Sequence, residues 1–279
     1  QTWKIQDVQR ASELIAKAQR PVLYGGGGLI NSGEQACEAF TQLAQTLNLP
    51  VTLTLMGLGG FAASDPRFLG MLGMHGTLEA NLAMHHADLV ICVGARFDDR
   101  ITGKLANFCP DAKKIHIDIH AGNINKVVPV DVALVGDSAE VLQALLEQLA
   151  QNTHQDAHQD AIQDLPAQDN LQDWWSRIEV LRAAQCLAFE PHATSIQPQA
   201  LMTELAQQLK GRDAIVSTDV GQHQMWAAQY LRFERPRRWL TSGGAGTMGY
   251  GLPAAIGAQV AHPNSLVVCV SGDASVLMN

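Results

Sequence analysis

The sequence lacks the features of a membrane, secreted or nucleic-acid-binding protein. No apolar run approaches the roughly 20 residues needed to span a bilayer, and the first residues do not form a signal-peptide pattern. The formal net charge is −8 and the sequence has no basic run, so nucleic acid and anionic membranes are not expected partners. We therefore expect a cytoplasmic protein that acts on small molecules.

Paired cysteines are also missing. The five cysteines are far apart and include no Cys-x-x-Cys pair, and no His/Cys cluster has metal-site spacing. This argues against a disulfide framework and a structural zinc site. Reduced thiols are predicted at Cys37, Cys92, Cys109, Cys186 and Cys269.

Length and periodicity predict two α/β domains. A chain of 279 residues with 47% hydrophobic content can form two cores. Strands that alternate with helices are typical of a parallel sheet covered on both faces. In the first domain we expect helices at 5–19, 34–47, 77–86 and 138–150, strands at 21–24, 51–55, 89–93, 114–119 and 132–135, and a Gly-rich stretch up to about 76.

Residues 151–170 are rich in Gln and Asp and predict an exposed linker between a first domain, 1–150, and a second, 171–279. A helix with Trp174 and Trp175 is expected to pack back on a domain. The remaining pattern predicts helices at 198–210, 222–230 and 247–261 and strands at 214–218 and 266–270. Because the chain starts at Gln1 and stops at Asn279 just after a strand, we expect a segment of a longer polypeptide whose second doubly wound domain is truncated.

Residues 244–249 form a Gly-x-Gly-x-x-Gly pattern, with Asp273 at the end of the next strand. One interpretation is a dinucleotide site, with Asp273 on a ribose. Another is a diphosphate site, because small residues after Asp273 leave backbone N–H groups free and the carboxylate can hold a divalent ion. A third is that Asp273 only caps a helix.

Residues 219–224 follow a predicted strand and begin a helix, which places Gln222 and His223 at a ligand crevice if the sheet is open and parallel. Both side chains can donate to phosphate oxygens, although a lone His is often only a cap. In the first domain, Asp118 at a strand end is compatible with ribose binding or with a structural turn. Arg100 is compatible with carboxylate binding, oriented by Asp99, or with a solvated charge cluster.

Five segments together resemble the acetohydroxyacid synthases (acetolactate synthases). They are MLGMHGTLEAN (71–81), VGARFDDRITGKL (93–105), INKVVPVDVALVGD (124–137), TDVGQHQMWAAQY (218–230) and TSGGAGTMGYGLPAAIGA (241–258). The likeness covers the chain except for the linker. It implies a central FAD-binding domain followed by the first part of a thiamine-diphosphate domain.

The resemblance also implies site residues. For FAD it implies Gly27, Thr54, Leu55, Leu72, Gly73, Met74, His75, Gly94, Ala95, Arg96, Phe97, Asp98, Asp118, Ile119, Asp137 and Ser138. For thiamine diphosphate it implies Gln222, His223, Gly246, Thr247, Met248, Asp273, Ala274 and Ser275, with Asp273 on Mg²⁺. Met248 is similar to the residue that supports the bent cofactor, and Arg100 to the one that receives the carboxylate of the second keto acid.

The implied reaction joins pyruvate to a second pyruvate or to 2-ketobutyrate with loss of carbon dioxide, in branched-chain amino acid synthesis, and FAD is structural. Homodimers or tetramers with a small regulatory subunit are the implied assembly. Ala274 and Ala245 depart from a usual glycine and leucine, and the family's activating glutamate and second magnesium ligand, an asparagine, are not in this sequence. We therefore expect this chain alone to be inactive. Alternatives are another thiamine-diphosphate decarboxylase or oxidase, and a non-catalytic FAD module.

Overall fold

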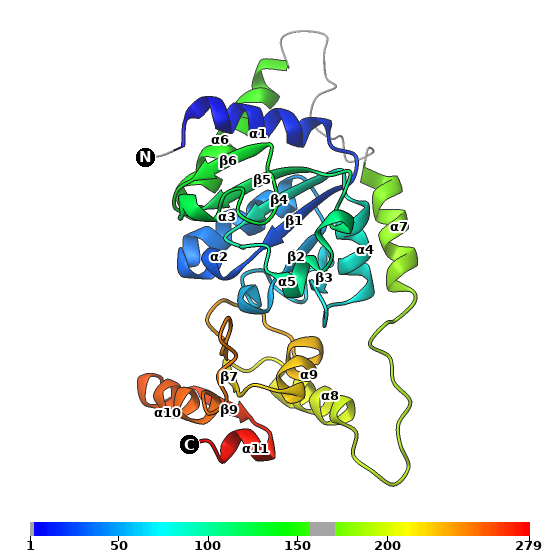
Figure 1. Cartoon of the computed structure of the whole chain (residues 1–279), viewed down its shortest axis with the longest axis vertical. Helices are drawn as coiled ribbons and strands as arrows, with labels where there is room; N and C mark the ends of the chain where they lie inside the picture. The colour runs from blue at the N-terminus through cyan, green and yellow to red at the C-terminus, as the bar shows by residue number, and fades with distance from the viewer. Residues whose placement is uncertain (1–2, 157–170) are drawn as a thin grey trace.

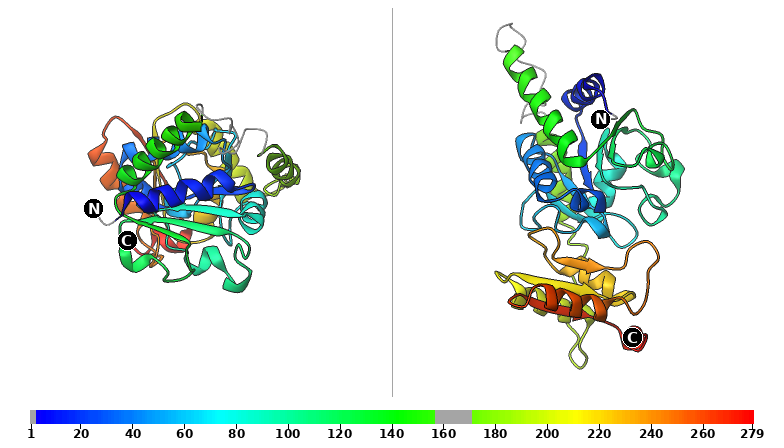
Figure 2. Two further views of the ribbon diagram at one scale, coloured as in Figure 1. Left: turned by 90° about the horizontal axis from the view of Figure 1, so that it is seen from above. Right: turned by 90° about the vertical axis from the view of Figure 1, so that its left-hand side faces the viewer.

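The structure, a computed structural model, describes residues 3–156 and 171–279 and contains two parallel β-sheets (Figure 1). The six strands of the first sheet are β1 (Pro21–Gly25), β2 (Val51–Leu53), β3 (Phe68–Met71), β4 (Leu89–Val93), β5 (Lys113–Asp118) and β6 (Val132–Val135). Those of the second are β7 (Ala214–Thr218), β8 (Trp239–Thr241) and β9 (Leu266–Val270). The right-hand view of Figure 2 shows the two units apart, with the blue-to-green one above the yellow-to-red one.

The helices alternate with these strands. They are α1 (Ile5–Lys17), α2 (Gly27–Asn31), α3 (Glu34–Thr46), α4 (Leu78–His86), α5 (Asp99–Thr102), α6 (Ser138–Asp156), α7 (Gln172–Arg182), α8 (Pro198–Leu209), α9 (Gln222–Tyr230), α10 (Gly251–Ala261) and α11 (Asp273–Val276). Three short 3₁₀ turns are η1 (Leu55–Gly57), η2 (Leu105–Asn107) and η3 (Ala121–Asn123).

The first sheet has the strand order β3-β2-β1-β4-β5-β6, so the chain reverses its direction of winding between β1 and β4. Helices α1, α3 and α6 cover one face, and α4 and α7 cover the other. Successive strand residues point to opposite faces, so Leu23 enters the first core and Tyr24 the second. Such a sheet binds ligands at the carboxyl ends of its strands, near the reversal.

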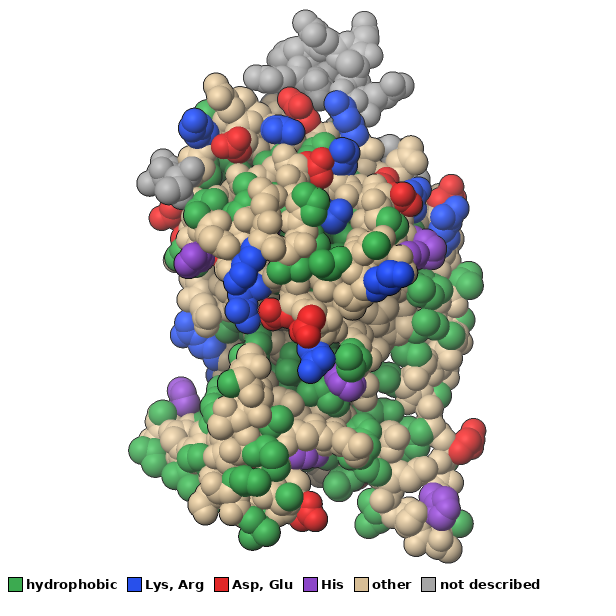
Figure 3. All heavy atoms as spheres, in the orientation of Figure 1, with side chains coloured by type: hydrophobic (Ala, Val, Ile, Leu, Met, Phe, Trp, Pro, Cys, Tyr) green, Lys and Arg blue, Asp and Glu red, His purple; other side chains and the backbone are tan. Residues whose placement is uncertain are grey.

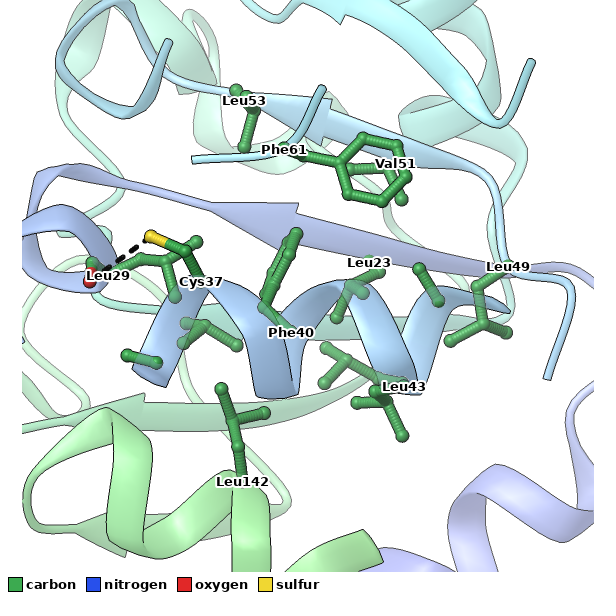
Figure 4. Close-up of a cluster of buried hydrophobic side chains, with 14 of the residues drawn as sticks. Leu23, Leu29, Cys37, Phe40, Leu43, Leu49, Val51, Leu53, Phe61 and Leu142 are labelled. Atoms are coloured by element: carbon green, nitrogen blue, oxygen red, sulfur yellow. Dashed lines mark hydrogen bonds between the residues drawn. The ribbon is translucent and has the colours of Figure 1, made fainter. Parts of the chain in front are cut away.

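The larger core lies between the sheet and helices α3 and α6. Figure 4 shows Phe40 of α3 in this layer, and its ring lies edge-on to Phe61 with centroids 6.2 Å apart. Leu43 and Leu142 extend the contact from α3 to α6. The helices fix the sheet rigidly, and with it the loops that leave its carboxyl edge.

The second sheet has the order β8-β7-β9, which puts its reversal between β7 and β9. Helix α10 packs on β7 and β9. The units also contact each other, because Ala63 N donates to Phe233 O at 3.1 Å and Ser64 Oγ to the Glu234 carboxylate at 2.6 Å. The space-filling view shows charges of both signs interspersed over the first unit, while apolar and uncharged side chains cover most of the second on this face (Figure 3).

The parallel α/β fold predicted from the sequence is confirmed, but some elements differ. The Gly-rich stretch contains β3, and β2 ends at Leu53 where η1 follows. Helix α10 begins at Gly251 rather than 247, because residues 244–249 form a loop in which Gly244, Gly246 and Gly249 all have positive φ.

The segment between the units also differs from expectation. Helix α6 continues to Asp156, six residues into the predicted linker, and the rest of that linker, 157–170, lies outside the described residues. Helix α7, grouped with the second domain by sequence, packs on the first. Trp174 Nε1 donates to Pro21 O at 3.1 Å, and Trp175 Nε1 to Asn48 O at 2.9 Å.

All five cysteines are free thiols, and three of them are buried. Among the helices that the structure describes, none combines the length and apolarity required to cross a membrane.

Candidate functional site

The residues predicted for the first site all follow carboxyl ends of strands in the six-stranded sheet. Gly27 follows β1, Thr54 and Leu55 follow β2, the 72–75 segment follows β3, and the 94–98 segment follows β4. Asp118 ends β5 and Ile119 follows it, while Asp137 and Ser138 follow β6. Six loops thus lie along one sheet edge, which is the edge where open α/β sheets bind ligands.

The loops after β1 and β4 pack directly on each other at the point of reversal. Gly26 N donates to Val93 O and Gly28 N to Gly94 O, both at 2.9 Å. A Cβ on Gly28 would lie 2.7 Å from Gly94 Cα, and Gly94 itself has φ +63°. Glycine is needed here for close approach, which brings the backbones of two strand-end loops together.

Hydrogen bonds from its own backbone N–H groups hold the segment 72–75 in place. Gly73 N donates to Asn81 Oδ1 at 3.1 Å, and Met74 N donates to Arg100 O at 2.9 Å. Leu72 is buried, whereas Met74 is 66% exposed and His75 is exposed. The hydrogen bond to Arg100 ties this loop to the start of α5.

Arg100 has a weakly held, exposed side chain. Its Nη1 lies 3.8 Å from Asp99 Oδ2, and both side chains are mostly exposed. The neighbouring Arg96 and Asp98 also form an exposed pair, at 3.4 Å. Pairs of this kind add little stability, so the Arg100 guanidinium is available to a carboxylate ligand.

Two predicted carboxylates are engaged within the protein. Asp118, 5% exposed, accepts from His120 N at 2.8 Å and from Asn123 Nδ2 at 3.1 Å, which supports the structural-turn interpretation. Asp137 Oδ1 accepts from Ser32 Oγ at 2.7 Å and from Ala139 N at 2.9 Å, so it holds the beginning of α6.

In the second unit, the loops after β7, β8 and β9 converge at the carboxyl edge. His223, in the first turn of α9, has its ring between the loops after β7 and β9, because a Cβ on Gly221 would lie 2.9 Å from its Cε1 and one on Gly272 3.1 Å from its Nδ1. Its Nε2 is buried and has no hydrogen-bond partner in the described part of the chain. Burial lowers the pKa of His223, against the opposing effects of the Asp219 carboxylate and backbone. The imidazole is therefore neutral, and its Nε2 is a donor or an acceptor according to the tautomer.

Asp219 organises the crevice, a role that sequence reasoning missed. Its side chain is fully buried, Oδ1 accepts from Val220 N at 2.8 Å and Gly249 N at 2.9 Å, and Oδ2 accepts from Gly251 N at 3.2 Å. One carboxylate thus ties the loop after β7 to both ends of the turn that enters α10. The sequence signal was an acidic residue at a strand end, directly before Val220 and Gly221.

Gln224 makes a second connection that the sequence did not predict. It is 4% exposed, and its Nε2 donates to Thr241 Oγ1 at 2.6 Å and to Ser242 O at 3.3 Å. Thr241 Oγ1 also lies 2.7 Å from Thr218 Oγ1. This network fixes the start of loop 242–250, in which Thr247 N donates to Ser242 Oγ at 2.9 Å and the Met248 side chain is 40% exposed.

The loop after β9 completes the arrangement. Ser275 is 3% exposed, and its Oγ donates to Val220 O at 3.1 Å, which joins the loops after β7 and β9. Asp273 is exposed, and its Oδ1 accepts from Ala274 N at 2.8 Å. Across the described ranges, no group of three or more His, Cys, Asp or Glu side chains could hold a metal. Any metal here would share Asp273 with oxygens of a ligand and of water.

A cavity of about 1160 Å³ lies elsewhere between the units. Residues from within 58–71, together with His75, Thr77 and Glu79, line it on one side, and residues from within 203–216 and 228–238 line it on the other. Of the predicted site residues, only His75 lines it. It adjoins Ala214, at the amino end of β7, whereas the predicted residues follow carboxyl ends. Size alone therefore does not identify it as the functional site.

Comparisons with known proteins agree with the division into two units. Residues 8–145 match the thiamine pyrophosphate enzyme central domain, and residues 219–279 match the thiamine pyrophosphate enzyme C-terminal TPP binding domain. The chain is 49% identical over 272 residues to the acetolactate synthase isozyme 3 large subunit of Escherichia coli (strain K12), which covers 98% of the chain and 45% of that relative. It is 46% identical to the acetolactate synthase large subunit of Haemophilus influenzae, over the same shares of the two sequences.

A third relative, the acetolactate synthase isozyme 2 large subunit of Escherichia coli (strain K12), is 45% identical over 278 residues, which cover 100% of the chain and 46% of that relative. The chain thus spans a little under half the length of these relatives.

Proposed function

The chain belongs to the thiamine pyrophosphate enzymes and is homologous to acetolactate synthase large subunits, and from this premise we propose that it supplies the FAD unit and part of the thiamine-diphosphate unit of an acetolactate synthase. The proposed reaction condenses pyruvate with a second 2-keto acid, pyruvate or 2-ketobutyrate, and releases carbon dioxide. The observation that carries the proposal is the position of the His223 ring between the loops after β7 and β9, with a buried Nε2 that has no hydrogen-bond partner among the described residues.

The crevice of the second unit fits a diphosphate. His223 Nε2 needs a partner, the beginning of α9 provides backbone N–H groups and a positive dipole end, and phosphate oxygens satisfy both. Gln222 is exposed beside His223 and can donate to the same group. Gly246, Thr247 and Met248 would contact the cofactor from the loop after β8, and Ala274 and Ser275 from the loop after β9.

Magnesium would be held by Asp273. Mg²⁺ is commonly bound by one or two carboxylates together with substrate phosphates and water, so a single exposed carboxylate beside a diphosphate crevice suits it. Bound thiamine diphosphate supplies the electron sink that decarboxylation requires. The chain's own residues hold and orient it, and Met248 would support its shape.

The first unit would bind FAD along the edge formed by its six strand-end loops. A glycine-dependent contact between the loops after β1 and β4 brings backbone close to the reversal point, where dinucleotides bind in such sheets. Since no net oxidation accompanies the proposed condensation, the flavin would have a structural role. Arg100, at the same edge and weakly paired, would receive the carboxylate of the second keto acid.

From the packing of α6 and α7, we propose that the first domain comprises residues up to Asp156 together with α7, and that the second begins after Arg182. The large-subunit names of the relatives support a small regulatory subunit as partner, and we propose a homodimeric or tetrameric assembly.

Two experiments test the proposal. Titration of the chain with FAD, followed by flavin fluorescence, should show saturable binding, and calorimetric titration with thiamine diphosphate and Mg²⁺ should show binding that Asp273→Asn weakens. Acetolactate formation from pyruvate tests the activity of the whole protein. Absence of both binding events, or no product from the whole protein with all three cofactors present, would refute the proposed function.

A further inference from the structure

Met56 joins the proposed FAD site to the proposed thiamine-diphosphate site. It lies in η1, directly after Thr54 and Leu55. A Cβ on Gly27 would lie 3.1 Å from Met56 Cβ, and a Cβ on Gly243 would lie 2.8 Å from Met56 Cγ. The Met56 side chain therefore extends from the glycine loop after β1 in one unit to the loop after β8 in the other.

Gln229 provides a second, independent connection. Its Nε2 donates to His75 O at 2.9 Å. His75 ends the 72–75 segment of the proposed FAD site, and Gln229 lies on α9, the helix whose first turn carries Gln222 and His223. Each of two FAD loops thus contacts an element of the diphosphate crevice.

The connected elements are stiff. In the first unit, Thr54 Oγ1 accepts from Gly57 N at 3.0 Å, and Met74 N donates to Arg100 O. In the second, Gln224 holds the beginning of loop 242–250 and Asp219 holds its end. A shift at one end must be accommodated at the other, because Met56 contacts the Gly27 and Gly243 loops at once and Gln229 is hydrogen-bonded to His75.

We infer that the two cofactor sites are energetically coupled through Met56 and Gln229, so that FAD bound in the first unit pre-positions loop 242–250 and α9 for the diphosphate. The inference rests on the proposed function. When bound FAD orders loops 54–57 and 72–75, the free energy needed to order loop 242–250 and α9 around the diphosphate is lower. Linkage requires that thiamine diphosphate tighten FAD binding by the same factor.

Calorimetric titration of the chain with thiamine diphosphate and Mg²⁺, with and without saturating FAD, measures the coupling. FAD should lower the dissociation constant at least about fivefold, the lower end of usual allosteric couplings. Met56→Ala and Gln229→Ala should each reduce this factor, and the double variant should bring it near one. Gly243→Ala is a second route to the same result, since a methyl group there must displace Met56.

Two matched variants serve as controls. Leu201→Ala removes a similarly exposed apolar side chain from α8, and Gln208→Ala removes a hydrogen bond that stays within α8. Both should keep the full coupling factor. Equal affinity with and without FAD, or full coupling in the double variant, would overturn the inference while leaving the proposed function intact. Failure of either cofactor to bind the unaltered chain would instead refute the proposed function, and the inference with it.

Discussion

Replacing the buried carboxylate Asp219 by alanine should destabilise the second unit and loosen its crevice. The substitution leaves three backbone N–H groups, those of Val220, Gly249 and Gly251, without their acceptor, and Asp219 is fully buried. Each unsatisfied buried donor costs about 1–3 kcal/mol, and since two of the three are only partly buried, the loss should be about 2–6 kcal/mol. That is a large part of the roughly 5–15 kcal/mol that stabilises a typical domain. Urea unfolding followed by tryptophan fluorescence measures it, since Trp226 and Trp239 both lie in the second unit.

Asp213→Ala is the matched control. Asp213 also accepts two partners, Arg235 and Arg238, but its side chain is 46% exposed, so its loss should cost no more than about 1 kcal/mol. Asp219→Asn keeps one carbonyl acceptor, so its loss of unfolding free energy should lie between those of Asp219→Ala and Asp213→Ala. A free energy of unfolding for Asp219→Ala within about 0.5 kcal/mol of the unaltered chain would refute the assignment of Asp219 as the organiser of the crevice.

Three further predictions concern close-packed glycines, a buried histidine and the reactivity of the cysteines. Gly28→Ala should lower the free energy of unfolding in urea by about 1–3 kcal/mol, because its Cβ would overlap Gly94. Gly257→Ala, whose Cβ would have nothing within 4 Å, should instead raise it by about 0.5–1 kcal/mol by stabilising α10. Equal changes in the two variants would contradict the prediction. Burial lowers the pKa of His116 from 6.5, so the unfolded chain binds more protons than the folded one, and the free energy of unfolding should fall as the pH drops below 6.5. In His116→Gln the free energy of unfolding should fall less steeply over the same pH range. If the two plots of unfolding free energy against pH are parallel, this histidine is not the cause. Cys37 and Cys109 are buried, with the pKa of each thiol raised to about 11, whereas Cys186 is exposed although burial raises the pKa of its thiol as well. A thiol reagent should therefore label Cys186 first, and Cys186→Ser should remove the fast phase of labelling; a fast phase that persists in this variant would count against the prediction.

The sequence predicted the α/β class because the apolar strands are short, continuous and separated by helical periodicity. It missed β3, where Gly70 interrupts a segment in which Phe68 and Gly70 are only partly buried, and it did not assign β8, which has only three residues. It also placed the start of α10 too early, since a Gly-rich run that can enter a helix can equally form a loop with positive φ.

For the candidate site, strand-end position was informative, because the carboxyl ends of parallel strands necessarily meet at one edge. The roles of Asp219 and Gln224 were not predictable, since both depend on loop backbone that is distant in sequence: Gly249 for one and Ser242 for the other. Asp118 shows the converse limit. Its position at a strand end suited a ribose, yet the turn that follows engages both of its oxygens.

Hydrogen exchange of the chain with and without thiamine diphosphate and Mg²⁺ tests the central claim most directly, because it locates the bound cofactor along the backbone. The account predicts slower exchange at 219–224, 242–250 and 271–275, the three strand-end loops at the carboxyl edge of the second sheet. Protection confined instead to residues 206–214 and 231–238, which line the cavity between the units, would contradict it.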